Sequence, residues 1–85
     1  MTISEVFDRL CGKRVSRIDF TDGSYVVCPT PMLVDFHDSD APAEAWIEPF
    51  NDGLVLHFNA NRISRDGQTG MQAQTEPLGN IMSVS

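Results

Sequence analysis

The chain has 85 residues, of which 41% are hydrophobic, and a formal net charge of −6 at pH 7. This length suits a single domain with a thin core, and the apolar content is too high for a disordered chain. No apolar run approaches the roughly 20 residues of a membrane span, and the acidic amino terminus lacks the basic flank of a signal peptide. We therefore expect a cytoplasmic protein whose two cysteines, Cys11 and Cys28, are free thiols.

An amphipathic helix is predicted at residues 2–11. Five apolar residues recur there at the spacing of one helix face: Ile3, Val6, Phe7, Leu10 and Cys11. Thr2 and Glu5 have the spacing of a capping box, and Gly12 stands where a left-handed residue commonly ends a helix. The polar residues between the apolar ones are expected to face solvent.

After Gly12 the apolar period changes to 2, which predicts a β-hairpin at residues 14–28 around Asp22-Gly23. A two-residue loop at this dipeptide places four apolar side chains on one face of the sheet: Ile18, Phe20, Tyr25 and Val27. Pro29 and Pro31 are expected to bend or break the sheet, because proline cannot donate to a ladder. A third strand is then predicted at residues 32–36.

A polar loop is predicted from Asp38 to Ala45, with one helical turn beginning at Asp40 as an open alternative. A second hairpin follows at residues 45–59. With Asp52-Gly53 as its loop, Ile47, Leu54, Leu56 and Phe58 share one face. The opposite face carries Trp46, Glu48, Phe50, Val55 and His57. A loop one residue longer would exchange the two sets.

The remaining chain is predicted to hold a turn at Asp66-Gly67, a mobile loop over residues 65–77 that is rich in Gln, Thr and Gly, and a short strand at 80–84. These elements predict an α+β fold. Its amino-terminal amphipathic helix packs on a small, mostly antiparallel curved sheet, or partial barrel, of four to six strands.

Charge is distributed unevenly, since no Lys or Arg occurs between Arg17 and Arg62. Eight carboxylates lie in that stretch: Asp19, Asp22, Asp35, Asp38, Asp40, Glu44, Glu48 and Asp52. Such a stretch repels phosphate backbones and attracts basic surfaces, so direct nucleic-acid binding is not expected. The alternative is that the charge serves solubility alone.

Three candidate sites have simpler structural interpretations beside the functional one. Asp35, His37, Asp38 and Asp40 hold metal-ligand atoms, but their spacing fits no calcium loop and suits helix and turn capping. Glu48 faces His57 in the predicted register, either as a cross-strand pair or for acid–base work. Trp46 belongs either to the core or to an interface. No phosphate loop, nucleophile elbow or zinc motif occurs, so we expect no enzyme, cofactor or bound metal.

The order of the helix, Gly12, a strand from Val15 to Phe20, Asp22-Gly23 and a second strand resembles the opening of Sm-like small barrels over about 25 residues. Three residues stand where that family has a glycine: Val26, Val27 and Cys28. The cation-free middle has no counterpart of its basic RNA-binding loop. The resemblance ends there, and no membership of the family follows from it.

The function that these observations favour is a small acidic protein-binding module or inhibitor that docks on a basic, possibly nucleic-acid-binding, surface of another protein. Small acidic proteins of phages and mobile elements act in this way against host defence nucleases, which is an analogy from size and charge. The expected partner-binding residues are Asp35, Asp38, Asp40, Glu44, Trp46, Glu48, Phe50 and Asp52. One alternative is a subunit of a homodimer or larger complex that uses the Trp46 face. Another is a metal- or small-molecule-binding domain that uses Asp35, His37 and His57.

Overall fold

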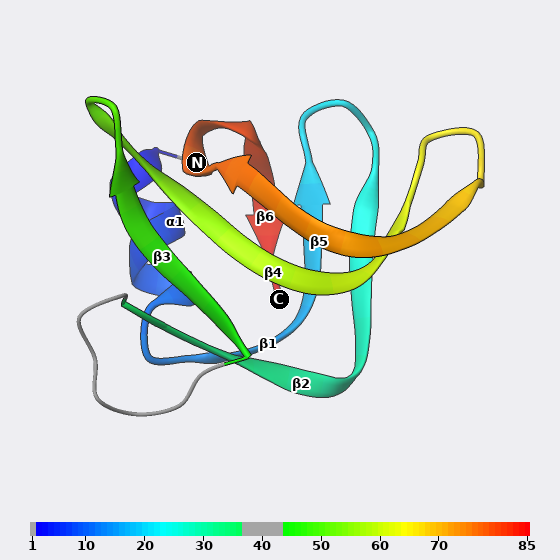
Figure 1. The fold of residues 1–85 in the computed structure, drawn as a ribbon, viewed down its shortest axis with the longest axis horizontal. Helices are drawn as coiled ribbons and strands as arrows, with labels where there is room; N and C mark the ends of the chain where they lie inside the picture. Colours follow the sequence, from blue (N-terminus) through cyan, green and yellow to red (C-terminus); the bar gives the residue numbers. More distant parts are fainter. Residues whose placement is uncertain (1, 37–43) are drawn as a thin grey trace.

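A computed structural model describes residues 2–36 and 44–85, with the backbone alone at 70–73. Its elements follow the chain in this order: helix α1 (Ile3–Leu10), strands β1 (Arg14–Phe20), β2 (Tyr25–Phe36), β3 (Ala45–Phe50), β4 (Gly53–Ile63) and β5 (Thr69–Pro77), the 3₁₀ turn η1 (Leu78–Asn80) and strand β6 (Ile81–Val84) (Figure 1). The strands form one sheet in the order β5-β4-β3-β2-β1-β6, in which β2 and β3 are parallel and the other neighbours antiparallel. This arrangement confirms the predicted α+β fold.

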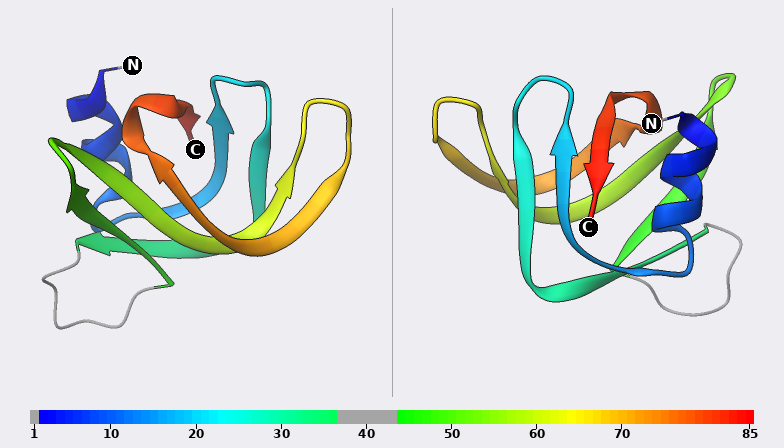
Figure 2. Two further views of the ribbon diagram at one scale, coloured as in Figure 1. Left: turned by 45° about the horizontal axis from the view of Figure 1, so that its top comes forward. Right: turned by 180° about the vertical axis from the view of Figure 1, so that it is seen from behind.

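The sheet curls into an open half-barrel (Figure 2), because β4 reaches past β3 to pair with β2 at Tyr25 and Val26. Buried apolar side chains from α1, η1 and strands β1, β2, β3, β4 and β6 fill its interior. Within this core the rings of Phe20 and Phe58 stack with their centroids 6.1 Å apart. The core therefore joins the first hairpin to the second.

Helix α1 begins and ends where its capping signals predict. The Thr2 hydroxyl accepts the Glu5 N–H, and the Glu5 carboxylate accepts the Thr2 N–H, each over 3.2 Å. Gly12 follows the helix with a φ of +72°. Val6 and Leu10 are buried, and the helix contacts β6 and η1. No helix in the described ranges is long and apolar enough to cross a membrane.

The first hairpin forms where predicted, but its predicted register is wrong. Phe20 donates its N–H to the Ser24 carbonyl over 2.9 Å, and Ile18 pairs with Val26. The loop therefore has three residues, Thr21 to Gly23, and ends on Gly23 at a φ of +89°. The extra loop residue moves each β2 side chain to the other face. Val26 is fully buried, whereas Val27 is 42% exposed.

The prolines bend β2 without ending it, so the predicted third strand at 32–36 is the second half of β2. Its two halves both pair with β1, and the β1 register shifts between Val15 and Arg17. Met32 and Val34 are buried as their alternation predicts. The residues between 37 and 43, including the predicted loop and helical turn, lie outside the described part of the chain.

The segment expected to be a mobile loop at 65–77 is the second error, because most of it is strand β5. β5 pairs with β4 along its whole length, from Thr69 opposite Ile63 to Pro77 opposite Val55. The polar composition of β5 does not predict a strand, and the segment becomes one because its backbone pairs with β4. The turn at Asp66-Gly67 forms as predicted, and β6 provides the short final strand.

Arg62 links the first hairpin to β5 through a network of polar contacts, called here the Arg62 network. The guanidinium donates to Ser24 Oγ and Glu76 Oε2, each over 3.0 Å, and to Asp22 Oδ2 over 3.3 Å. It also lies 4.1 Å from the centroid of the Phe20 ring. The network connects the first hairpin to β4 and β5, and it buries Ser24 to 5% exposure.

Asp19 makes the equivalent connection between β1 and β6. Its carboxylate accepts hydrogen bonds from Arg17 Nη2 over 2.9 Å and from Ser83 Oγ over 3.1 Å. The Arg17 hydrogen bond, assisted by Ser83, lowers the pKa of Asp19 below its ordinary value of 3.8 against the opposing effect of burial. The ionised form is therefore stabilised by folding.

We expect Asp19→Asn to reduce stability at neutral pH and to match the wild type in strong acid. A carboxyl whose pKa is lowered by folding stabilises the protein above its unfolded pKa of about 3.9, and this stabilisation is lost as the pH falls through the folded pKa. The melting-temperature difference between the two proteins should close between about pH 5 and pH 2. Asp8→Asn, at an exposed helix position, is the charge-matched control. Parallel curves for wild type and Asp19→Asn would contradict the role assigned to this contact.

Candidate functional site

The β3–β4 hairpin keeps the predicted division of side chains between its faces, although its loop lies one residue earlier than expected. Phe50 pairs with Gly53 and Ile47 with Leu56, so the loop is Asn51-Asp52. Asn51 has a φ of +48°, a conformation that asparagine tolerates. The register changes by an even number of residues, so no side chain moves to the opposite face. The prediction that Glu48 lies directly opposite His57 is wrong, because Trp46 occupies that position.

Glu48 and His57 nevertheless meet, because they are diagonal neighbours on the face of β3 and β4 that points away from the core. This face is called here the outer face, and it carries Trp46, Glu48, Phe50, Val55 and His57. The Glu48 carboxylate contacts Nε2 of His57, and both side chains are about one quarter exposed. On the other side of the imidazole, Nδ1 lies 3.0 Å from Oγ1 of Thr75 on β5. Glu48, His57 and Thr75 thus form a row across three strands.

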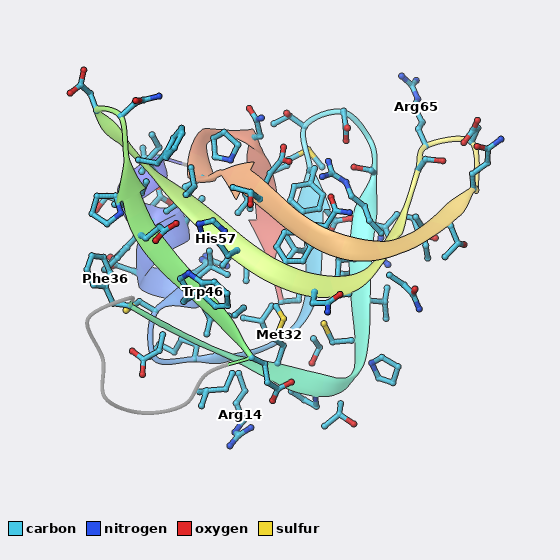
Figure 3. All side chains as sticks on the ribbon, viewed as in Figure 1. Arg14, Met32, Phe36, Trp46, His57 and Arg65 are labelled. Atoms are coloured by element: carbon cyan, nitrogen blue, oxygen red, sulfur yellow. The ribbon has the colours of Figure 1, made fainter. Side chains whose placement is uncertain are left out.

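Trp46 stacks on this row. Its ring and the His57 imidazole have centroids 5.2 Å apart and planes at 16° (Figure 3). The contact of Nδ1 with Thr75, the neighbouring Glu48 carboxylate and the stacked indole together restrict the orientation of the imidazole and of Trp46. Sequence reasoning missed Thr75, because no motif marks it and its segment was predicted to be a loop.

The row contains a hydroxyl, an imidazole and a carboxylate, which is also the composition of a nucleophilic triad. Acyl transfer needs donors that stabilise a developing oxyanion next to the nucleophile. Glu44 is among the residues that line the cavity beside Thr75, and its negative charge opposes the development of an oxyanion there. The arrangement is suited to holding Trp46 in place.

The outer face leaves large aromatic surface in contact with solvent. Trp46 is 38% exposed and Phe50 is 60% exposed, whereas Val55 on β4 is buried. Trp46 therefore lies at the surface and not in the core, and its role in an interface stays a prediction. Figure 3 shows Trp46 and His57 side by side on β3 and β4.

Of the expected partner-binding residues, Trp46, Glu48 and Phe50 lie on the outer face, and the other five fall into three groups. Asp35 is half-buried on β2, in register with Trp46 on β3. Glu44 is exposed directly before β3, and Asp52 is exposed in the loop after it. The structure thus places Glu44 and Asp52 at opposite ends of β3, roughly 20 Å apart at the rise of an extended strand. Asp38 and Asp40 lie outside the described residues.

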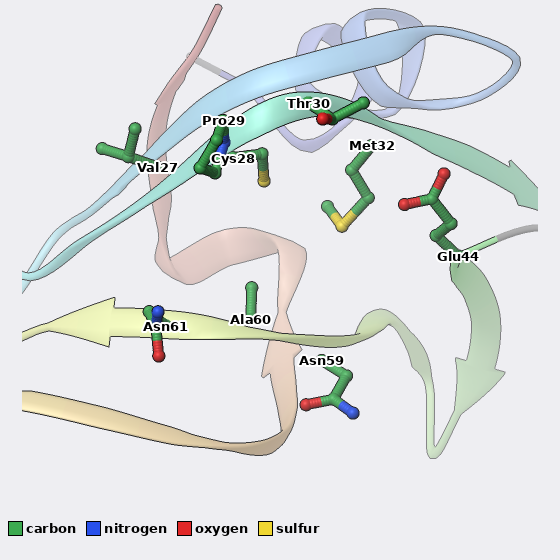
Figure 4. Close-up of a pocket in the computed structure, with 9 residues that line it drawn as sticks. All are labelled: Val27, Cys28, Pro29, Thr30, Met32, Glu44, Asn59, Ala60 and Asn61. Atoms are coloured by element: carbon green, nitrogen blue, oxygen red, sulfur yellow. The ribbon is translucent and has the colours of Figure 1, made fainter.

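A cavity of about 380 Å³ opens between β2 and β4 next to the outer face (Figure 4). It exists because β4 pairs with β2 only at Tyr25 and Val26, while β3 joins β2 only from Val34 onward. Between these pairings β2 bends away from β4. The thiol of Cys28 and the thioether of Met32 point into the opening, with Glu44 at its side.

A second cavity, of about 270 Å³, lies between Trp46, His57 and Thr75. Glu44 and Asn59 line both cavities, so the two are neighbours, and together they are called here the Glu44 groove. Burial, with a smaller contribution from the Glu44 carboxylate, raises the pKa of the Cys28 thiol above its ordinary value of 9.0. Cys28 therefore remains a protonated, apolar wall of the groove at neutral pH.

The alternative of a metal site depends on Asp35, His37 and His57, which are only partly described. His57 is held by Glu48 and Thr75, and His37 lies outside the described residues. Among the residues that the structure describes, no group of three or more His, Cys, Asp or Glu side chains is placed to hold a metal ion.

Comparisons with known proteins give no relative. The sequence matches no family model, and no curated protein and no solved structure is significantly similar to it.

Proposed function

We propose that this protein is a small protein-binding module that docks its outer face on a basic surface of another protein. The observation that carries the proposal is the exposure of Trp46 and Phe50 beside carboxylates on one face of a rigid sheet. Aromatic residues with a polar rim are typical anchors of protein interfaces. Trp46 is already held by His57, so little side-chain entropy is lost when it is covered.

The charge around this face supports a basic partner. No cationic side chain occurs between Arg17 and Arg62 in the sequence, and Glu44 and Asp52 are exposed at the two ends of β3. Complementary charge raises the association rate and excludes acidic competitors. Proteins that bind nucleic acids carry the most positively charged surfaces, and an inhibitor that occupies such a surface is the form of the proposal that we favour.

A second copy of the chain is the competing occupant. Two-fold association through the outer face would bring the same carboxylates of both copies together, because the same patch meets itself. Like charges at an interface are costly. The net charge of −6 therefore favours a partner of opposite charge over self-association.

We expect the double substitution Glu44→Gln with Asp52→Asn to weaken binding of fluorescent octa-arginine, a soluble probe of basic surfaces. The matched control, Asp8→Asn with Asp66→Asn, removes the same charge away from the outer face. Removing two rim charges should lower the affinity roughly fivefold and flatten its salt dependence, whereas the control should change it less than about twofold. Fluorescence anisotropy at two salt concentrations measures both quantities.

If the two double variants weaken binding equally, the position of the charge does not matter. The charge then serves solubility alone, and the proposal is contradicted. A stable dimer of the wild type that Phe50→Ser dissociates would also contradict it, in favour of self-assembly. Light scattering at several protein concentrations detects that outcome.

A further inference from the structure

The Glu44 groove provides a more specific form of recognition than the outer face alone. At about 380 Å³ its larger cavity falls at the lower end of the range for ligand sites, roughly 300–1,000 Å³. That size suits one long side chain of a partner. Because the cavity adjoins the exposed Trp46 through Glu44 and Asn59, a partner on the outer face could place a side chain in it.

The walls of the cavity are apolar along their length and polar at one side. Val27, Pro29, Met32 and Ala60 offer hydrocarbon and thioether surface, and Cys28 adds a protonated thiol. Glu44, Asn59 and Asn61 supply oxygen acceptors. None of the described residues that line it carries a positive charge. Figure 4 shows the Glu44 carboxylate beside the opening and the two sulfur atoms within it.

This combination matches an alkyl stem that ends in a cation. Long basic side chains bury their methylene groups against apolar surface and keep the charged end at a polar rim. A guanidinium is less strongly hydrated than an ammonium and offers several donors in one plane, so it suits a carboxylate at the side of an apolar opening. The Glu44 carboxylate also acts across the cavity on the Cys28 thiol, whose pKa it helps to raise. Its negative field therefore extends into the opening.

We propose that the cavity between β2 and β4 receives an arginine side chain of the basic partner, with its stem against Met32 and its guanidinium on Glu44. This inference rests on the proposed function and identifies one anchoring contact within it.

The test uses n-butylguanidinium as the probe and the neutral, nearly isosteric n-butylurea as the matched ligand. Both are titrated into the full ¹⁵N-labelled chain and followed by two-dimensional NMR. We expect n-butylguanidinium to shift the amide signals of Cys28, Met32 and Ala60 with a Kd of roughly 1–20 mM, as its small size allows. Butylurea should bind at least about fivefold more weakly, and Glu44→Gln should remove most of this difference. Asp8→Asn, at an exposed position of α1 away from the cavity, should leave both titrations unchanged.

Three results would overturn the inference. The first is the absence of shifts around the cavity, and the second is equal binding of the charged and neutral probes, which would make the cavity a general apolar site. The third is an unchanged preference in Glu44→Gln. All three leave the proposed function intact if octa-arginine still distinguishes the two double variants. If the two double variants bind octa-arginine equally but n-butylguanidinium still binds in the cavity, the proposed function is refuted and the arginine-binding cavity is not.

Discussion

Replacing Val26 with aspartate should remove a large part of the protein's stability, whereas the same substitution at Val27 should change it little. Val26 is fully buried on β2, between Ile18 of β1 and Arg62 of β4. A carboxylate there loses water without gaining a partner, and we expect a loss of about 4 kcal/mol or more in the free energy of unfolding. A domain of this length has about 4–13 kcal/mol in total. Urea denaturation followed by circular dichroism measures the change.

Val27→Asp is the matched control because it introduces the same residue one position along the strand. Val27 is 42% exposed, and the cost of aspartate in an exposed strand position is about 1 kcal/mol or less. The two variants also distinguish the two registers of the first hairpin. A two-residue loop would bury Val27, so a larger loss of stability in Val27→Asp than in Val26→Asp would contradict the observed register.

Replacing Arg62 with methionine should destabilise the protein by about 2–4 kcal/mol, because it removes one member of a largely buried polar network. The Arg62 and Glu76 side chains are only 18% and 14% exposed. Methionine preserves much of the packing on Phe20 but leaves the Ser24 hydroxyl and the Glu76 carboxylate without the guanidinium. Thermal or urea unfolding at neutral pH measures the loss.

The control for this experiment is Arg65→Met in the neighbouring turn. Arg65 is exposed, so its replacement removes the same charge at an expected cost within about 0.5 kcal/mol. If Arg62→Met is no more destabilising than Arg65→Met, the Arg62 network contributes nothing to the stability of the half-barrel.

Helix α1 could be predicted from sequence because several independent local signals agree. The apolar period, the capping box of Thr2 and Glu5 and the glycine at position 12 all act within a few residues of one another. The first hairpin has only one such signal, Asp22-Gly23, which is compatible with loops of two or three residues. Pairing of β2 with β1 and β4 decides between them, and a local pattern does not contain that information.

The residues of the outer face could be predicted because side chains alternate between the faces of β3 and β4. An even shift in register leaves each side chain on the same face. The error in the loop therefore left Trp46, Glu48 and His57 on one face and made Glu48 a diagonal neighbour of His57. Thr75 could not be predicted, because β5 has little apolar content and becomes a strand through its pairing with β4. The Arg62 network could not be predicted either, because it joins residues far apart in the sequence, such as Asp22 and Arg62, which are forty residues apart.

The position of β5 at the edge of the sheet gives the net charge a further role. Edge strands offer unpaired backbone groups to other chains, and natural proteins usually protect them with lysine, proline or short length. Residues 69–75 of β5 contain neither a charge nor a proline. Each molecule carries a net charge of −6. The resulting repulsion between molecules opposes aggregation through their edge strands. If the proposed function is correct, colloidal stability and partner recognition depend on the same carboxylates, and added salt weakens both by screening their charge.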